Sequence, residues 1–264
     1  MPTALIVEDE PEANKLLALL VQLRGYSAVS AFTGNEALEK IQDRLPDIVF
    51  LDLMLPDING YEVCRRLKSR KHTSLIPVVM VTARVAAENR EESFCVGADD
   101  YIPKPYTPDQ IFQAMEDADT WRKEIERDSC GREGVITFGS ESDESLRQLA
   151  HLRNLLVART TLDVAAVCVL GDALQELRTS ADRWSRQRGE EVYAVLGYQI
   201  LADRLTFTLK DDSGWLAQTR NSPGEAWPAA FAVAGFDAIQ YRRDECLLTF
   251  SRAFPPGSPL AEPA

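Results

Sequence analysis

The chain divides into two parts by its pattern of hydrophobic and polar positions. Residues 3–106 alternate short aliphatic runs with segments of helical period. The expected strands are 4–7, 27–31, 47–51, 78–81 and 101–102, and the expected helices are 12–24, 35–42, 60–69, 87–94 and about 107–119. This alternation predicts a doubly wound α/β fold, a five-stranded parallel sheet with helices on both faces. The run Ile48–Leu51 is apolar at every position, as a strand buried on both faces requires.

The pattern changes after residue 120. Residues 121–134 are mostly polar and predict a helical extension and linker. Residues 135–254 predict an α+β sandwich with both helices on one sheet face. Its expected strands are 135–138, 192–201, 204–209 and 245–250, and its expected helices are 146–157 and 164–184. The expected domains are therefore 1–120 and 135–254, joined by 121–134 and followed by a proline-rich, disordered tail at 255–264.

Charge and cysteine content narrow the function classes. The net charge of -12 and the pI near 4.8 argue against a generally cationic nucleic-acid binder. The five cysteines form no C-x-x-C pair, which favours a reducing cytoplasm over a disulfide framework or a zinc site. The most apolar stretch, 162–174, contains two aspartates, and no signal-peptide pattern opens the sequence. We therefore expect a cytoplasmic protein without a membrane partner.

Polar side chains follow four of the strands expected in the first domain. They are Glu8, Asp9, Asp52, Thr82 and Lys104. Since the carboxyl ends of parallel strands meet at one edge of a sheet, these side chains should converge there. Converging carboxylates repel one another, and an open, oxygen-rich site of this kind suits Mg²⁺. A lysine can pair with a carboxylate or a phosphoryl oxygen, and a hydroxyl can bind another such oxygen.

With these residues in place, the first domain resembles the response-regulator receiver family. The segments that carry the resemblance are 6–11 (Ile-Val-Glu-Asp-Glu-Pro), 52–60 (Asp-Leu-Met-Leu-Pro-Asp-Ile-Asn-Gly), 81–84 (Val-Thr-Ala-Arg) and 97–106 (Gly-Ala-Asp-Asp-Tyr-Ile-Pro-Lys-Pro-Tyr). The resemblance covers residues 3 to about 120. It implies the five-stranded receiver fold and a switch that is controlled by phosphorylation.

The resemblance also implies roles for single residues. Asp52 would accept phosphate from a sensor histidine kinase or a phosphotransfer protein. The implied Mg²⁺ ligands are Glu8, Asp9, Asp52 and the main-chain carbonyl of Met54. The implied phosphate-contacting and switch residues are Thr82, Ala83, Tyr101 and Lys104, with a cis peptide bond between Lys104 and Pro105. Output in the family often uses the surface of residues 87–119, here a candidate homodimer contact.

The second domain resembles the histidine-kinase-type ATPase superfamily, in its short anti-sigma serine-kinase form. The segments that carry this resemblance are the Leu-rich helix 146–157, residues 171–184 and residues 211–216. Three features depart from the family. Ser180 stands where a metal-binding Asn would follow Glu176, Leu216 replaces the last Gly of an Asp-x-Gly-x-Gly box, and the lid segment 229–235 holds one glycine. What would survive is a residual nucleotide site at Glu176, Asp212 and Gly214, although an ordinary turn between strands explains residues 212–214 equally well.

The sequence thus favours a two-component response regulator whose second domain is a non-catalytic, ATPase-like effector. That effector would act on a downstream protein of unknown identity. An enzymatic alternative is a phosphorylation-controlled serine kinase or ATP-binding protein of the anti-sigma type, and it requires tight ATP binding. A further alternative is a DNA-binding transcription regulator, and it requires salt-sensitive binding to duplex DNA.

Overall fold

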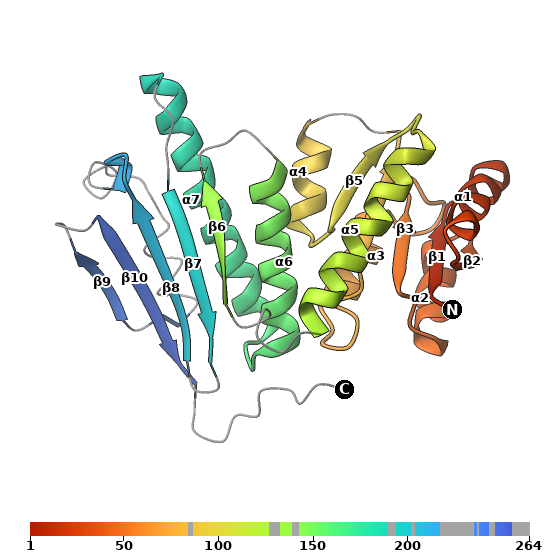
Figure 1. The fold of residues 1–264 in the computed structure, drawn as a ribbon. Coiled ribbons are helices and arrows are strands. Elements are labelled where there is room, and N and C mark those ends of the chain that lie inside the picture. The colour runs from red at the N-terminus through yellow and green to blue at the C-terminus, as the bar shows by residue number, and fades with distance from the viewer. Residues whose placement is uncertain are drawn as a thin grey trace. The chain divides into compact units, whose positions relative to one another are not determined.

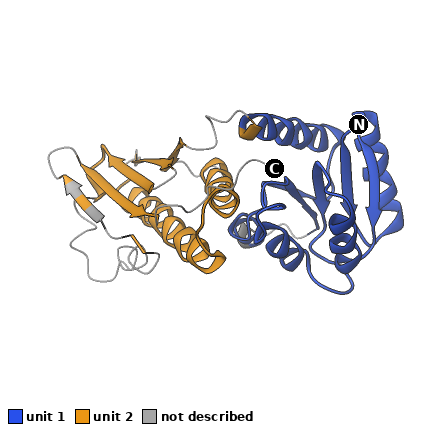
Figure 2. Cartoon of the chain, turned by 90° about the horizontal axis from the view of Figure 1, so that it is seen from below, with its two compact units in different colours: residues 1–124 blue, residues 125–264 orange. Residues whose placement is uncertain are grey.

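The computed structural model describes residues 1–83, 87–126, 133–138, 143–189, 194–201, 204–216, 235–236, 238–242 and 246–254. The chain forms two compact units, residues 1–124 and residues 125–264 (Figure 2). Each unit has its own sheet, and the two are taken in turn. In the part of the chain that the structure describes, no helix combines the length and the apolar character that crossing a membrane needs.

The first unit is built on a parallel sheet with strand order β2-β1-β3-β4-β5 (Figure 1). The strands are β1 (Thr3–Val7), β2 (Ser27–Ala31), β3 (Ile48–Leu51), β4 (Val78–Thr82) and β5 (Asp100–Pro103). Every residue of β1, β3 and β4 is buried, because helices cover both faces of the sheet. The predicted doubly wound fold of this unit is confirmed.

Five helices connect these strands. They are α1 (Pro11–Leu23), α2 (Gly34–Asp43), α3 (Gly60–Lys68), α4 (Ala87–Cys95) and α5 (Pro108–Glu126). Helices α2 and α3 begin at side-chain caps, where Thr33 accepts from the Glu36 amide and Asn59 accepts from the Glu62 amide. Helix α5 extends seven residues beyond the predicted end near residue 119.

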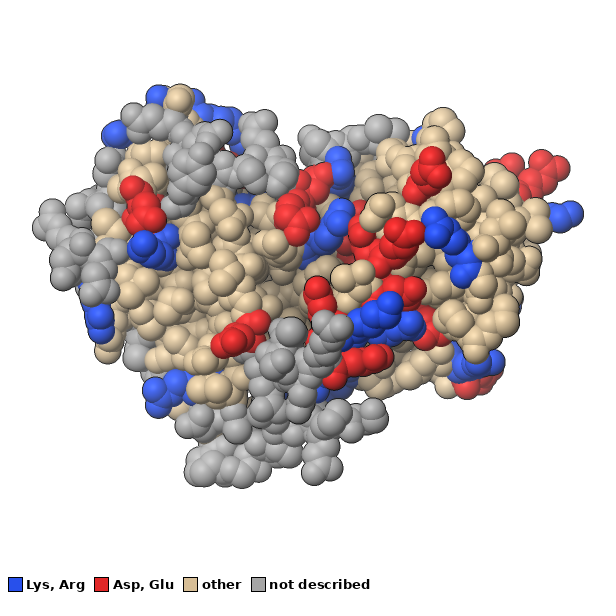
Figure 3. Space-filling view, viewed as in Figure 1, with Lys and Arg blue, Asp and Glu red and all other residues tan. Residues whose placement is uncertain are grey.

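Helices α1 and α5 share one face of the parallel sheet. Their buried side chains, including Leu17 and Ile111, form a single core with Ile6 of β1, Phe50 of β3 and Val81 of β4. Figure 3 shows acidic and basic side chains together on the face that carries α5. A salt bridge between Arg24 and Glu116, 3.0 Å long, joins the end of α1 to α5 on this face.

The second unit contains an antiparallel sheet with strand order β6-β7-β8-β10-β9. Its strands are β6 (Glu133–Phe138), β7 (Ala194–Ile200), β8 (Arg204–Asp211), β9 (Ala238–Arg242) and β10 (Leu247–Ala253), and its helices are α6 (Asp143–Arg159) and α7 (Val164–Arg188). In Figure 1 the two helices lie beside one face of this sheet. Along β8 buried and accessible residues alternate, as expected for a sheet with one covered face.

The α+β class predicted for the second unit is confirmed, with differences in detail. Strand β9 was not predicted, and α7 runs four residues beyond its predicted end. Its end is a left-handed Gly189, a usual C-cap for a helix. Most of the predicted lid segment, residues 229–234, and the predicted tail, residues 255–264, lie outside the described residues.

Candidate functional site

Three carboxylates meet at the carboxyl edge of the parallel sheet. Glu8 and Asp9 follow β1, and Asp52 follows β3; the register pairs Val7 with Leu51, so both strands end at the same level. One oxygen from each of the three acids lies within 4.8 Å of the others. Glu8 and Asp52 are 2% and 6% exposed, whereas Asp9 is open to solvent. The sequence predicted this convergence, and the donor set suits a divalent cation that prefers oxygen ligands.

Lys104 holds two of these acids together. Its Nζ donates to Asp52 Oδ2 at 2.6 Å and to Glu8 Oε2 at 2.5 Å. The lysine is placed by β5, whose last residue pairs with Thr82 of β4, and its own amide donates to the Thr82 carbonyl at 2.8 Å. The Lys104–Pro105 peptide bond is cis, as expected.

Burial and charge act against each other in this pair. Burial raises the pKa of Glu8 above its ordinary value, and it outweighs the opposing hydrogen bond and charge of Lys104. Burial lowers the pKa of Lys104, but the hydrogen bonds that its ammonium group donates to Asp52 and Glu8, together with their negative charges, outweigh burial and leave that pKa raised. The site therefore holds its ammonium group firmly in the charged form, while one of its carboxylates binds a proton more readily than usual.

The loop after β3 is shaped by a close backbone approach. The Met54 amide donates to Asp52 Oδ1 at 3.1 Å, and the Gly60 amide donates to the Leu53 carbonyl at 3.1 Å. A Cβ atom at Gly60 would lie 2.3 Å from the Asp52 carbonyl oxygen, so this position requires glycine. The sequence reading gave Gly60 no chemical role. Its place eight residues after the acid in the 52–60 segment was the available signal.

The same loop also supports a neighbouring helix. Both carboxylate oxygens of Asp57 accept amide hydrogen bonds at 2.8 Å, one from Gly34 and one from Asn35. These two residues open α2, where the unpaired amides and the helix dipole favour a negative charge. Hydrogen bonds thus connect the loop after β3 directly to α2.

The implied switch residues lie on β4, which pairs with β3, and on β5, which pairs with β4. Thr82 is fully buried at the end of β4, and Tyr101 is buried in β5, 6% exposed. The register pairs Tyr101 with Met80, two residues before Thr82. Ala83 is exposed at the start of the following loop, and Arg84 lies outside the described residues.

In the second unit, the residues predicted for a residual nucleotide site have different surroundings. Asp212 is exposed and pairs with Lys210 at 3.2 Å, and Glu176 is half-buried on α7. The buried acid of this turn is Asp211, whose carboxylate accepts hydrogen bonds from the Ser213 amide, the Ser213 hydroxyl and the Leu216 amide. Asp211 therefore stabilises the turn that follows β8, a role that the sequence reading missed.

Two of the positions that depart from the ATPase pattern, Ser180 and Leu216, are buried. The Trp215 indole, fully buried, donates to Ser180 Oγ at 3.3 Å, which places the turn after β8 against α7. Leu216 is 2% exposed. Gly214 adopts a positive φ of 81°, which suits glycine in a tight turn.

Comparisons with known proteins identify the first unit. Residues 4–116 match the family model of the response regulator receiver domain. The chain is similar to the phosphate regulon transcriptional regulatory protein PhoB of Rhizobium meliloti, 38% identical over 111 residues that cover 42% of this chain and 49% of the relative. It is also similar to the protein of that name from Pseudomonas aeruginosa, 40% identical over 109 residues that cover 41% of this chain and 48% of the relative.

A similar solved structure is that of a response regulator from Chloroflexus aurantiacus. It is 34% identical to this chain, covers 45% of this chain and 98% of its own, and superposes with a TM-score of 0.43. The chain spans about half the length of the two phosphate regulon relatives.

Proposed function

We propose, from the premise that residues 4–116 are a response regulator receiver domain, that this chain accepts a phosphoryl group on Asp52. The donor would be a sensor histidine kinase or a phosphotransfer protein. The observation that carries the proposal is the meeting of Glu8, Asp9 and Asp52 around one point, with Lys104 bound to the central acid. An isolated buried carboxylate would be costly, whereas this one is held in place by an ammonium group and an amide.

The chemistry is a direct transfer between two side chains. An oxygen of Asp52 forms a bond to phosphorus as the bond between phosphorus and the donor histidine nitrogen breaks, and that nitrogen keeps the electron pair. Mg²⁺, bound by Glu8, Asp9, Asp52 and the Met54 carbonyl, would neutralise charge on the phosphoryl oxygens. Lys104 already donates to Asp52, so its ammonium group lies where a phosphoryl oxygen on that acid could be bound.

The switch that follows would use Thr82 and Tyr101. A phosphoryl group on Asp52 offers acceptor oxygens near the end of β4, and the Thr82 hydroxyl would move to donate to one of them. Tyr101, buried one strand away, would then repack. A few kcal/mol of differential stability between two states is enough for such a change. The surface of residues 87–119 would carry the result, by homodimerisation or by contact with another protein.

For the second unit we propose a non-catalytic effector with an ATPase-like fold that acts through protein contacts. Ser180 supports this, because its hydroxyl packs against the Trp215 indole at the position of a metal ligand. The buried Leu216 supports it too, since it fills the place of a glycine that the family pattern requires. DNA binding is a second candidate for output, because the two phosphate regulon relatives are transcriptional regulators by name. It ranks second because their similarity covers less than half of this chain and does not include the second unit.

The phosphorylation proposal is tested by labelling. Purified full-length protein, incubated with acetyl phosphate and Mg²⁺, should gain the mass of one phosphoryl group, and chelation of Mg²⁺ should prevent the gain. Asp52→Asn should abolish labelling. Asp43→Asn, which alters an exposed acid at the end of α2, should be labelled like the wild type. An unlabelled wild type, or an Asp52→Asn variant labelled equally well, contradicts the proposal.

A further inference from the structure

A buried asparagine lies directly behind the acidic site. Asn14 is the fourth residue of α1 and is 2% exposed. Asparagine is a poor helix former, and burying its amide costs free energy unless its polar atoms are hydrogen-bonded. The turn that carries Glu8 and Asp9 comes directly before this helix, and Glu8 lies six residues before Asn14. The position therefore invites a functional explanation.

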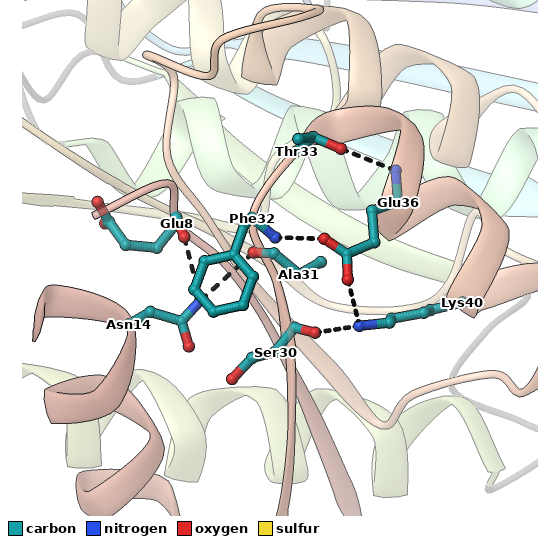
Figure 4. A network of polar contacts seen from close by, with 8 residues as sticks. All are labelled: Glu8, Asn14, Ser30, Ala31, Phe32, Thr33, Glu36 and Lys40. Atoms are coloured by element: carbon teal, nitrogen blue, oxygen red, sulfur yellow. Dashed lines mark hydrogen bonds and ion pairs between the residues drawn. The ribbon is translucent and has the colours of Figure 1, made fainter. Parts of the chain in front are cut away.

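The side chain of Asn14 bridges the ends of two strands. Its Nδ2 donates to the Glu8 carbonyl at 3.1 Å and to the Ala31 carbonyl at 3.3 Å, as Figure 4 shows. Both partners are carbonyl oxygens, so the group that faces them must be the NH₂ and not the amide oxygen. Its two hydrogens are thereby both used.

The Ala31 carbonyl that receives this bond also accepts from the Glu8 amide at 3.1 Å. Glu8 is therefore held at both of its main-chain polar groups. Its amide binds the end of β2 directly, and its carbonyl binds the same point through Asn14. The backbone from which the Glu8 and Asp9 side chains extend cannot move without breaking one of these bonds.

The end of β2 is itself fixed from the other side by α2. The Glu36 carboxylate accepts from the Phe32 amide at 2.7 Å and from Lys40 Nζ at 2.6 Å, and Lys40 also donates to the Ser30 carbonyl (Figure 4). The Thr33 hydroxyl caps the same helix at the Glu36 amide, 3.1 Å away. Ala31 thus lies between two residues that α2 restrains, and it gives Asn14 a fixed anchor.

We propose that Asn14 is a positioning residue of the acidic site. It holds the turn after β1 so that the carboxylates of Glu8 and Asp9 stay close to Asp52 despite their mutual repulsion. One oxygen from each of these acids lies within 4.8 Å of the others, and of the three acids Glu8 and Asp52 share the Lys104 ammonium group. Groups that orient metal ligands from behind commonly change metal affinity by about 10- to 100-fold when removed. This inference rests on the proposed magnesium-dependent function.

The test is magnesium binding by the unphosphorylated full-length protein, measured by isothermal titration calorimetry with magnesium chloride alone. Asn14→Ala keeps a good helix former and removes the bridge, and it should weaken Mg²⁺ binding by about 10-fold. The matched control is Val21→Ala, which removes a fully buried side chain from the same helix and leaves the bridge intact. Both variants should unfold at lower urea concentration, but only Asn14→Ala should lose Mg²⁺ affinity.

A kinetic readout separates positioning from general damage. In acetyl phosphate labelling, Asn14→Ala should need about 10-fold more Mg²⁺ for half-maximal rate and should approach the wild-type rate when Mg²⁺ is saturating. Wild-type affinity in Asn14→Ala, or an equal loss in Val21→Ala, overturns the inference. A wild-type protein that binds no Mg²⁺ overturns the proposed function instead, so the two failures are distinguishable.

Discussion

At the scale of single residues, the first unit contains two buried or half-buried glutamates in opposite electrostatic situations. Glu8 has a raised pKa because burial outweighs its ammonium partner. Glu36 has a lowered pKa because the hydrogen bonds from Lys40 and from the Phe32 backbone amide outweigh burial, which would raise it.

Glu36 should therefore stabilise the fold in a pH-dependent way. Its pKa is lower in the folded than in the unfolded protein, so its contribution is present above the unfolded pKa and is lost as the pH falls through the folded pKa. Glu36→Gln should lower the free energy of urea unfolding at pH 7 by up to about 1 kcal/mol, a small value because the side chain is partly exposed. The gap should shrink at pH 4. Lys40→Met should reproduce part of it, and a gap that is equal at both pH values would contradict this account.

At the scale of elements, β4 is held by an ion pair away from the acidic site. Lys68, at the end of α3, donates to the carbonyls of Ser74 and Ile76 and to Asp99 Oδ2 at 2.7 Å. Asp99 also accepts from the Val78 amide, the first of β4. The pair is almost fully buried, so α3, the start of β4 and the turn before β5 depend on one another.

Removing one partner of this pair should be costly. Lys68→Met leaves the Asp99 carboxylate buried without its ammonium group, and the free energy of unfolding should fall by about 3 kcal/mol. Lys15→Met changes an exposed lysine on α1 and should alter it by less than about 0.5 kcal/mol. Chemical denaturation of both variants measures the difference. Equal stability would show that the buried pair contributes little.

The elements also show what the sequence could and could not predict. The central parallel strands were predictable because a run such as Ile48–Leu51 has no polar position. Strand β9 was missed because Ala238–Arg242 is short and its period-two pattern ends in a charged residue. The structural role of Asp211 was missed, although a signal existed. Leu205, Phe207 and Leu209 alternate inward along β8, and that alternation places Asp211 inward as well.

In the acidic site, the converging side chains were predictable because parallel strands end together, but their supports were not. Gly60 and Asn14 act through backbone atoms that are distant in sequence, the carbonyls of Asp52 and Ala31. For Asn14, no local pattern in the sequence reports such a contact, and for Gly60 the one signal is its place eight residues after Asp52. Only the packed structure brings these atoms together.

At the scale of the whole molecule, a receiver domain is followed by a second unit built on an antiparallel sheet. If the second unit is a non-catalytic effector, the full-length protein should bind ATP with Mg²⁺ no more tightly than about 1 mM, because Ser180 and Leu216 are packed into the interior. A fluorescent nucleotide titration measures this. A dissociation constant in the micromolar range, abolished by Asp212→Asn, would instead favour the ATP-binding alternative.

The two hydrogen bonds that Asp57 accepts from backbone amides have a mechanical consequence for the first unit. Asp57, in the loop that follows Asp52, accepts the first two amides of α2. The end of the same loop is held by the hydrogen bond from the Gly60 amide to the Leu53 carbonyl. The loop after Asp52 is therefore held both at Asp57 and at Gly60. A displacement of Asp52 would therefore shift Asp57 and, with it, the first turn of α2. The structure near the sheet edge opposite β5 would then also depend on the chemical state of Asp52.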